Sequence, residues 1–357
     1  MTSIDVSKDV SPAATRAYSD YARPTWQRWL LSRESAVIVA LIVVAVGASL
    51  VVPNFGTTTT LGFLLLDATP ILLIALPMTL VIVSGEIDLS VASTLGLSSV
   101  TLGVLTKAGW PIEAAMVVCL VVGLLAGALN GFLVTVVGLP SLAVTIGTLA
   151  LYRGIAVGLL GTTAITDFPL FWQTLVQSRF GQTGIPVVMV LVVILIVVFA
   201  VLLHFTPYGR GIYALGLSKD AAAFSGVNVN RTKFIAFLLT GLISALAGIY
   251  WTLRYGSARG DNAIGLELSV IAAVLLGGVS IFGGKGALHG VVAGVLLIGV
   301  LQSALRLANV SSDAINIITG VLLIVSVISP RVFGWIRARR ASRRRSRTPP
   351  AREAESA

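Results

Sequence analysis

The sequence has little charge, one cysteine and two histidines, and each shortage excludes a class of protein. Only 11% of its 357 residues are charged, whereas soluble domains carry about 25%, so a soluble globular fold is excluded. The single cysteine, Cys119, lies inside an apolar run and leaves no disulfide framework and no cysteine-based metal site. Two isolated histidines also leave no set of metal ligands or nucleophiles. We therefore expect no catalytic residues and no bound metal, which makes a membrane-embedded enzyme the weakest functional alternative.

The chain also lacks the phosphate-binding loop that ATPases use. The nearest segment, residues 283–286 (GGKG), has Val279 where the first glycine of that motif belongs, and Gly286 where serine or threonine binds Mg²⁺. A tight turn with close helix packing is the better interpretation of these glycines. We expect no ATP hydrolysis and no directly bound cofactor on this chain. Glycines four residues apart at positions 123, 127 and 131 likewise suit close crossing of helices.

Long apolar runs dominate the sequence instead. Hydrophobic residues make up 56% of the chain, and its mean hydropathy is +0.96. Runs of roughly 20 residues, long enough to cross a bilayer, recur throughout, and they predict an all-α polytopic membrane protein with about ten transmembrane helices. The third and eighth of these spans are short and glycine-rich, so we expect one or both to be broken or re-entrant. The expected spans are approximately residues 35–52, 61–84, 89–106, 112–137, 141–160, 185–204, 233–253, 268–282, 287–306 and 314–330.

Polar tails flank this predicted transmembrane domain, which covers residues 35–330. The N-terminal tail, residues 1–34, precedes the first apolar run, and such a long polar leader argues against a cleaved signal peptide. The C-terminal tail, residues 331–357, is basic and rich in Ser, Arg, Pro and Glu. That composition cannot build a core, so we expect this tail to be disordered.

Positive charge gathers on one side of the predicted domain. Of the 25 Lys and Arg residues, five precede the first span, nine follow the last, four lie in the central loop 206–233, and one is Lys285. Ten spans place all of these on the same side, which the positive-inside rule assigns to the cytoplasm together with both termini. The long loop 161–184, with Arg179 as its single cation, is then outside. The net charge of +10 therefore indicates topology and contact with anionic lipid rather than nucleic-acid binding.

The central loop, residues 206–233, is the longest polar break in the chain. Ser218 is suited to be an N-cap, residues 219–225 can make about two helical turns around an alanine run, and Gly226 suits the C′ position. A free helix that short is marginal in water, so it persists only if it docks on something. We interpret the loop as a surface offered to a partner. A solvated connection between two spans is the alternative.

Two pairs of short matches indicate an inverted internal repeat. Residues 88–91 (DLSV) open the third predicted span, and residues 267–270 (ELSV) open the eighth. Residues 145–149 (TIGTL) are similarly matched by residues 318–322 (ITGVL). The matched spans are five apart, and an odd separation inserts the two copies with opposite orientation.

An acidic turn precedes the third span and is a candidate gate or signature turn. Its residues are Gly85, Glu86, Asp88 and Ser90. Both carboxylates are expected at the cytoplasmic end of the second span, where a charge costs less than at mid-membrane. Asp88 followed by Ser90 is placed to cap the next helix, with the carboxylate at the positive end of the helix dipole. We favour this capping role over direct contact with a solute.

Polar side chains inside predicted spans are costly to expose to lipid and are candidates to line a pore. Asp67 and Arg153 could line the pathway, or they could pair with one another or with polar groups elsewhere; we favour structural pairing. The further pore-lining candidates are Asn130, Thr145, Thr148 and Gln302.

Four segments in order carry a resemblance to a known family. They are GEIDLSVAS (residues 85–93), LNGFLVTVVGLPSLAVTIGTLALYRG (129–154), the central loop, and LLGGVSIFGGKGALHGVVAG (275–294). Together they resemble the ribose/sugar-type permease subunit of bacterial ABC importers, which includes ribose, xylose, rhamnose and autoinducer-2 permeases, over about residues 35–330. The family usually has Gly-Gly-Ile-Asp where this chain has residues 85–88 (GEID). The extra carboxylate is similar to the rhamnose-like branch.

The resemblance implies a transport subunit of the bacterial inner membrane that is not an enzyme. It would import a monosaccharide, rhamnose- or ribose-like, or a related small polar solute, by alternating access. Its partners would be two cytoplasmic ATP-binding subunits that hold ATP–Mg, a second permease copy or paralogue, and an extracytoplasmic sugar-binding protein. The central loop would be the coupling helix, with contacts through Arg210, Ser218, Lys219, Asp220, Ala221, Ala222, Ser225 and Gly226. An ion-coupled secondary transporter is the alternative, because inverted repeats and broken helices suit it equally.

Overall fold

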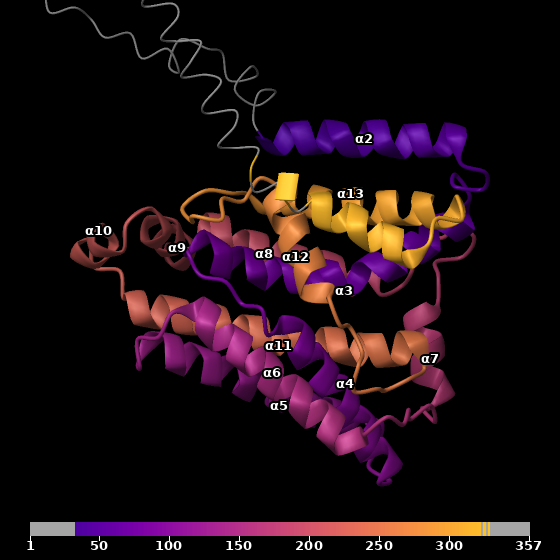
Figure 1. The fold of residues 1–357 in the computed structure, drawn as a ribbon, viewed down its shortest axis with the longest axis horizontal. Helices are drawn as coiled ribbons and strands as arrows, with labels where there is room; N and C mark the ends of the chain where they lie inside the picture. Colours follow the sequence, from indigo (N-terminus) through magenta and orange to yellow (C-terminus); the bar gives the residue numbers. More distant parts are fainter. Residues whose placement is uncertain (1–32, 323, 326–327, 329–357) are drawn as a thin grey trace, which may run out of the picture.

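The structure is a computed structural model that describes residues 33–322, 324–325 and 328. Most of both predicted tails and the end of the last predicted span lie outside the described residues. The described chain is a bundle of helices (Figure 1), whose only extended pairing is two isolated β-bridges. The helices are α2 (Arg33–Val51), α3 (Thr58–Val83), α4 (Val91–Lys107), α5 (Ile112–Thr135), α6 (Ser141–Leu160), α7 (Leu170–Gln177), α8 (Met189–Phe205), α9 (Pro207–Leu217), α10 (Lys219–Phe224), α11 (Val229–Tyr255), α12 (Leu266–Leu276), α13 (Leu288–Leu307) and a last helix at Ser312–Leu322.

The predicted all-α membrane fold is confirmed, and each predicted span overlaps a helix. Six of the described helices are long and apolar enough to cross a membrane, or seven if α8 and α9 count as one bent span. With α8 and α9 counted as one span, three shorter apolar helices, α4, α12 and 312–322, bring the number of apolar segments in the described chain to ten, as predicted. Their lengths do not show that each of them crosses the membrane fully. The ten crossings therefore stay a prediction.

Helix α3 forms the centre of the bundle. Its side chains are apolar all round, as expected of a helix enclosed by protein, and they are buried without a break from Ala68 to Val83. α8, α11, α12 and α13 pack around it. α2 lies at the edge beside α13, on the opposite side of the bundle from α5 and α6 (Figure 1). The core is therefore centred on α3, while the outer helices turn apolar side chains outward, as lipid-facing helices do.

Glycines let α5 and α11 cross with their backbones in contact. A Cβ atom at Gly127 would collide with the carbonyl oxygen of Phe237, and one at Gly241 would collide with backbone atoms of α5. Gly123 faces the same stretch of α11. The close crossing predicted from the spacing of these glycines is confirmed, and it joins the two halves of the chain.

Two helices, α4 and α12, begin inside the bundle rather than at its ends; we call them the half-helices. Figure 1 shows residues 84–90 running inward from the end that carries α10, and residues 256–265 running inward from the end that carries α7. The first segment contains residues 88–90 of the DLSV motif, and the second directly precedes the helix that contains the ELSV motif. The half-helices point in opposite directions along the bundle, which is the arrangement that an inverted repeat requires. The third and eighth predicted spans are therefore short, as expected.

Candidate functional sites

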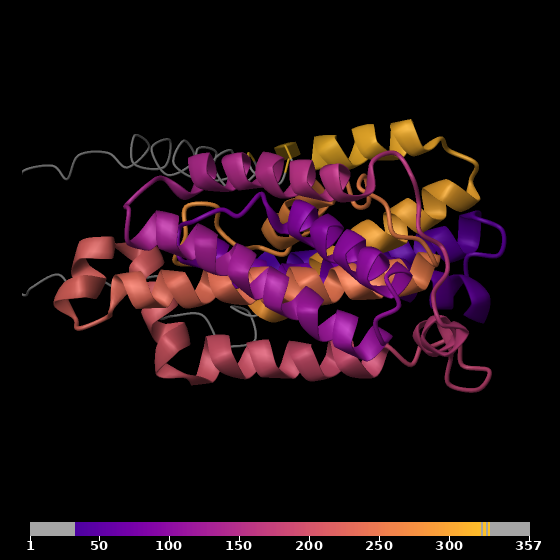
Figure 2. The same cartoon turned by 90° about the horizontal axis from the view of Figure 1, so that it is seen from below.

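A bend in the chain places two short helices at one end of the bundle, the α10 end. α8 and α9 meet at an angle of 66°, and Figure 2 shows the chain turning sharply from α8 into α9 and α10. Thr206 caps the first turn of α9 by accepting a hydrogen bond from the N–H of Gly209, and Pro207 occupies a first-turn position where its missing N–H costs nothing. The sequence did not predict α9, because residues 207–217 lie within the loop 206–233, which is the longest polar break in the chain.

The predicted helix α10 and its caps are present. The Ser218 hydroxyl accepts from the N–H of Ala221 at 3.3 Å. Gly226 adopts a φ of +82°, the left-handed conformation that suits a C′ glycine. The helix covers Lys219–Phe224, one residue shorter than predicted.

We call residues 207–226, which contain α9 and α10, the tip. One of its predicted coupling residues is buried against the bundle, and the others are exposed. Ala222 is only 1% exposed and holds α10 against the bundle. The other predicted coupling residues are exposed: Arg210, Ser218, Lys219, Asp220, Ala221, Ser225 and Gly226. The most exposed side chain was not predicted, since Phe224 is 94% exposed and Leu217 is 67% exposed at the same tip. Both are large apolar residues within a polar loop, and this contrast is the sequence signal that could have identified them as contact residues.

The tip is tied to the segments that enter and leave the half-helices. Tyr213 of α9 donates to the carbonyl oxygen of Gly286 at 2.6 Å. The N–H of Gly284 donates to the carbonyl oxygen of Val83 at 2.8 Å, and Gly216 packs against both of these residues. Val83 leads into residues 84–90 and α4, and the turn around Gly284 follows α12. Movement of the tip would therefore act on both half-helices through short backbone connections.

The two carboxylates of the acidic turn have different surroundings. Glu86 forms an ion pair with Lys233 at the start of α11. Asp88 is 1% exposed and accepts hydrogen bonds from the N–H of Ser90 at 2.9 Å, the hydroxyl of Ser90 at 2.7 Å and the hydroxyl of Thr240 at 2.9 Å. Asp88 therefore binds Ser90, the residue directly before α4, while the N-cap position of α4 has no side-chain cap hydrogen bond. Asp88 is thus enclosed by protein, beside Thr240 of α11, and the position of both carboxylates relative to the membrane edge stays a prediction.

Helix α6 satisfies the extended backbone of this turn. The hydroxyl of Ser141 accepts a hydrogen bond from the N–H of Ile87 at 3.2 Å, and the hydroxyl of Thr145 donates one to the carbonyl oxygen of Ile87 at 3.3 Å. Irregular backbone at membrane depth requires such partners. Asn130 of α5 completes the cluster by donating to the Ser90 hydroxyl at 2.8 Å.

Arg153 of α6 binds α4 and the segment that enters α12. Its guanidinium donates to the carbonyl oxygen of Gly260 at 2.8 Å and to that of Asn262 at 2.7 Å. A longer contact of 3.3 Å reaches the carbonyl oxygen of Ala92 in α4. The side chain therefore joins α4 to the loop before α12, and it does not pair with Asp67.

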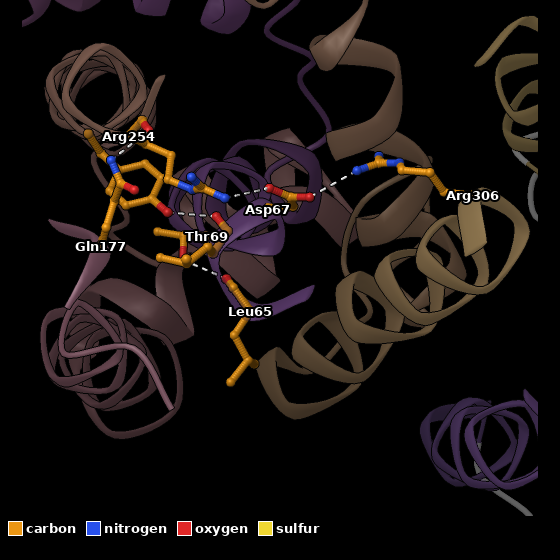
Figure 3. Close-up of polar contacts among 8 residues, drawn as sticks. Leu65, Asp67, Thr69, Gln177, Arg254 and Arg306 are labelled. Carbon is orange, nitrogen blue, oxygen red and sulfur yellow. Dashed lines mark hydrogen bonds and ion pairs between the residues drawn. The ribbon is translucent and has the colours of Figure 1, made fainter. Parts of the chain in front are cut away.

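Asp67 instead forms ion pairs near the opposite end of the bundle, the α7 end. One carboxylate oxygen lies 3.6 Å from Arg254 of α11, and the other lies 3.0 Å from Arg306 of α13. Figure 3 shows Asp67 between the two guanidinium groups. The guanidinium groups of Arg254 and Arg179 also lie over the ring of Phe63, at 5.7 and 5.0 Å from its centroid. Three helices are thus joined by one carboxylate.

This cluster lines a pocket of about 380 Å³ at the α7 end. Its wall includes Thr60, Phe63, Asp67, Arg254, Tyr255, Ser303 and Arg306. Toward the middle of the bundle lies a crevice of about 20 Å³ between α3 and α13, which shares Asp67 and Arg306 with the pocket and includes Gln302. Of the predicted pore-lining residues, Asp67 and Gln302 therefore line a cavity together. Asn130, Thr145 and Thr148 are buried, and Asn130 and Thr145 direct their hydrogen bonds to the acidic turn.

Comparison with known proteins identifies the family. Residues 59–327 match the family described as the permease component of the branched-chain amino acid transport system. An autoinducer 2 import system permease protein of Salmonella typhimurium is 35% identical, with 86% of this chain and 93% of that protein covered. The Escherichia coli O157:H7 protein of the same name is 36% identical over 84% of this chain and 92% of its own length.

A third relative extends the range of organisms. The autoinducer 2 import system permease protein of Photorhabdus luminescens is 36% identical over 72% of this chain and 78% of its own length. No solved structure matches. The chain therefore belongs to the permease component family of branched-chain amino acid and sugar-type ABC importers, and it is a multi-pass protein of the inner membrane.

Proposed function

We propose that this chain is the permease through which an ATP-driven importer moves a monosaccharide or a related small polar solute into the cell. Its relatives are permeases named for autoinducer 2 import, and rhamnose- or ribose-like sugars are the related solutes that the sequence suggests. ATP–Mg would bind to two separate subunits. A second permease copy or paralogue and an extracytoplasmic binding protein would complete the importer.

The observation that carries this proposal is the exposed apolar tip at the α10 end. A side chain as apolar as Phe224, 94% exposed on a six-residue helix, is costly in water unless a partner covers it. Lys219 and Asp220 surround it with charge that a soluble partner can pair with. An ATPase subunit with an apolar groove fits this surface.

The α10 end would face the cytoplasm. The central loop and Lys285 lie at this end, and the loop is one of the cation-rich segments that the positive-inside rule assigns to that side. α2 begins toward the same end in Figure 1, and helix 312–322 runs back toward it. This placement is the one that ten crossings produce.

The structure suggests how ATP binding would be transmitted to the pathway. Closure of the two ATPase subunits would move α10, which Ala222 fixes to the bundle. The hydrogen bonds from Tyr213 to Gly286 and from Gly284 to Val83 would pass this movement to the two half-helices. A shift of α4 against α12 would open one side of the domain and close the other, which is alternating access.

The test is co-purification of the native complex from its membrane in mild detergent, with Phe224→Glu as the variant. We expect the ATPase subunit to accompany the wild-type chain and to be lost with Phe224→Glu, together with ATP-driven uptake. Phe171→Ala is the matched control, because Phe171 is an aromatic residue 69% exposed on α7 at the other end. Uptake by the chain alone on an ion gradient, without ATP, would overturn the proposal.

A further inference from the structure

We propose that the pocket at the α7 end is a binding site for a small neutral hydroxylated solute. The inference rests on the proposed function for the orientation of the bundle, because the α7 end faces outside when the α10 end faces the cytoplasm. The pocket volume of about 380 Å³ falls in the range of about 300–1,000 Å³ typical of small-molecule sites. The pocket would be the first place where this subunit holds the solute.

The chemistry of the pocket favours a solute that both donates and accepts hydrogen bonds. Asp67 presents an acceptor, and Arg254 and Arg306 present donors on either side of it, at 3.6 and 3.0 Å. Adjacent hydroxyl groups can donate to the carboxylate and accept from a guanidinium at the same time. An anionic solute would instead compete with Asp67 for both arginines and place two negative charges side by side, which costs energy at short distance.

The remaining walls suit the apolar face of such a solute. Phe63 and Tyr255 contribute aromatic rings, and Thr60 and Ser303 contribute hydroxyl groups. Small-molecule sites usually have apolar and aromatic walls with a few polar groups among them.

The pocket is closed toward the α10 end. The adjoining crevice has a volume of about 20 Å³, too little for a sugar. Beside Gly299 the space between α3 and α13 would hold about one methyl group, because a Cβ atom placed there would lie at an ordinary van der Waals distance, 3.7 Å, from the Cβ atom of Ala68. A solute in the pocket would therefore wait at the α7 end until α3 and α13 separate.

Cysteine labelling tests the site in cells. The native Cys119 is buried, so Ser303→Cys supplies an accessible thiol on the pocket wall. Spheroplasts that express the complete importer would be treated with a membrane-impermeant maleimide, with and without L-rhamnose, D-ribose or autoinducer 2. We expect the solute that the same cells import to slow labelling of Ser303→Cys several-fold. Thr183→Cys, on an exposed loop outside the pocket, should label at an unchanged rate.

Second-site variants separate binding from unrelated shielding. Adding Asp67→Asn to Ser303→Cys should raise the solute concentration for half-protection roughly tenfold or more, because a hydrogen bond to a charged acceptor is lost. Arg306→Gln should act in the same direction, and its side chain is 64% exposed, so its removal leaves the fold intact.

The outcomes distinguish this site from the proposed function. If the imported solute gives no protection, or if Asp67→Asn and Arg306→Gln leave protection unchanged, the site is wrong and the importer stands. Protection by anionic sugar acids alone would also overturn the assignment of a neutral solute. Protection by a neutral sugar without any ATP-driven uptake would support the site and overturn the proposed function.

Discussion

Replacing Arg153 is expected to loosen both half-helices at once. Its guanidinium donates to the carbonyl oxygens of Gly260 and Asn262, which precede α12, and to that of Ala92 in α4. Arg153→Met removes these donors while keeping an unbranched side chain of similar reach. The three carbonyl groups are then left inside the bundle, where water does not readily replace the lost donors.

The expected loss follows from the geometry of these bonds. The two shorter ones, at 2.7 and 2.8 Å, are charge-assisted, and each contributes about 1.5 kcal/mol at the lower end for charged donors. The third, at 3.3 Å, adds little. Relief from burying part of a charged group offsets some of this sum. We expect Arg153→Met to lower the free energy of unfolding by about 2–3 kcal/mol.

The assay is unfolding of the purified permease in mixed detergent micelles, followed by far-UV circular dichroism, with solute uptake measured in parallel. Arg153→Lys keeps the charge, but a compact ammonium lacks the fork that reaches several carbonyls, so it should recover less than half of the loss. Arg259→Gln is the control, because Arg259 pairs with Asp261 at an exposed position and its replacement should leave unfolding unchanged. If Arg153→Met unfolds within about 0.5 kcal/mol of the wild type, the carbonyl groups have other partners and the reasoning is refuted.

Two further predictions concern packing and charge. Gly127→Leu should destabilise the permease by about 1–3 kcal/mol in the same assay, because the new side chain meets the carbonyl of Phe237; Gly158→Ala on α6, with open space beside it, should be neutral, and equal effects would contradict the close crossing. Lys233→Glu should destabilise the fold by leaving two carboxylates together, and adding Glu86→Lys should restore most of the loss. A double variant as unstable as the single one would show that the ion pair is not structural.

Local signals made α10 predictable, while the packing of its residues was not. Ser218 and Gly226 act through hydrogen bonds and backbone angles within a few residues, so the sequence contains all the information needed. The burial of Ala222 and the exposure of Phe224 depend on where the bundle lies relative to the helix. The sequence of the loop does not show which side of α10 faces the bundle. A bulky side chain at Ala222 would therefore disturb packing before it affected a partner.

The polar clusters show the same limit at longer range. The cost of a charge in a span identified Asp67 as exceptional, and its role in pairing is seen in the structure. One partner, Arg306, lies 239 residues further along the chain, where no spacing rule connects the two. The hydrogen bonds of Asp88 to Ser90 are local in the sequence, but its burial depends on Thr240 of α11. The residue type alone indicated that each carboxylate needs a partner, whereas the identity of most partners depends on the tertiary fold.

The half-helix arrangement has a consequence for how the protein is made. Residues 84–90 leave the ribosome long before their partners, and Thr240 follows Asp88 by 152 residues. At a synthesis rate of about 5–20 residues per second, roughly 8–30 s pass before that partner exists. During this time the polar backbone of the segment and the Asp88 carboxylate cannot face lipid without a large cost. The insertion machinery must therefore shelter this segment, and α4 reaches its final position only after more than half of the chain has been translated.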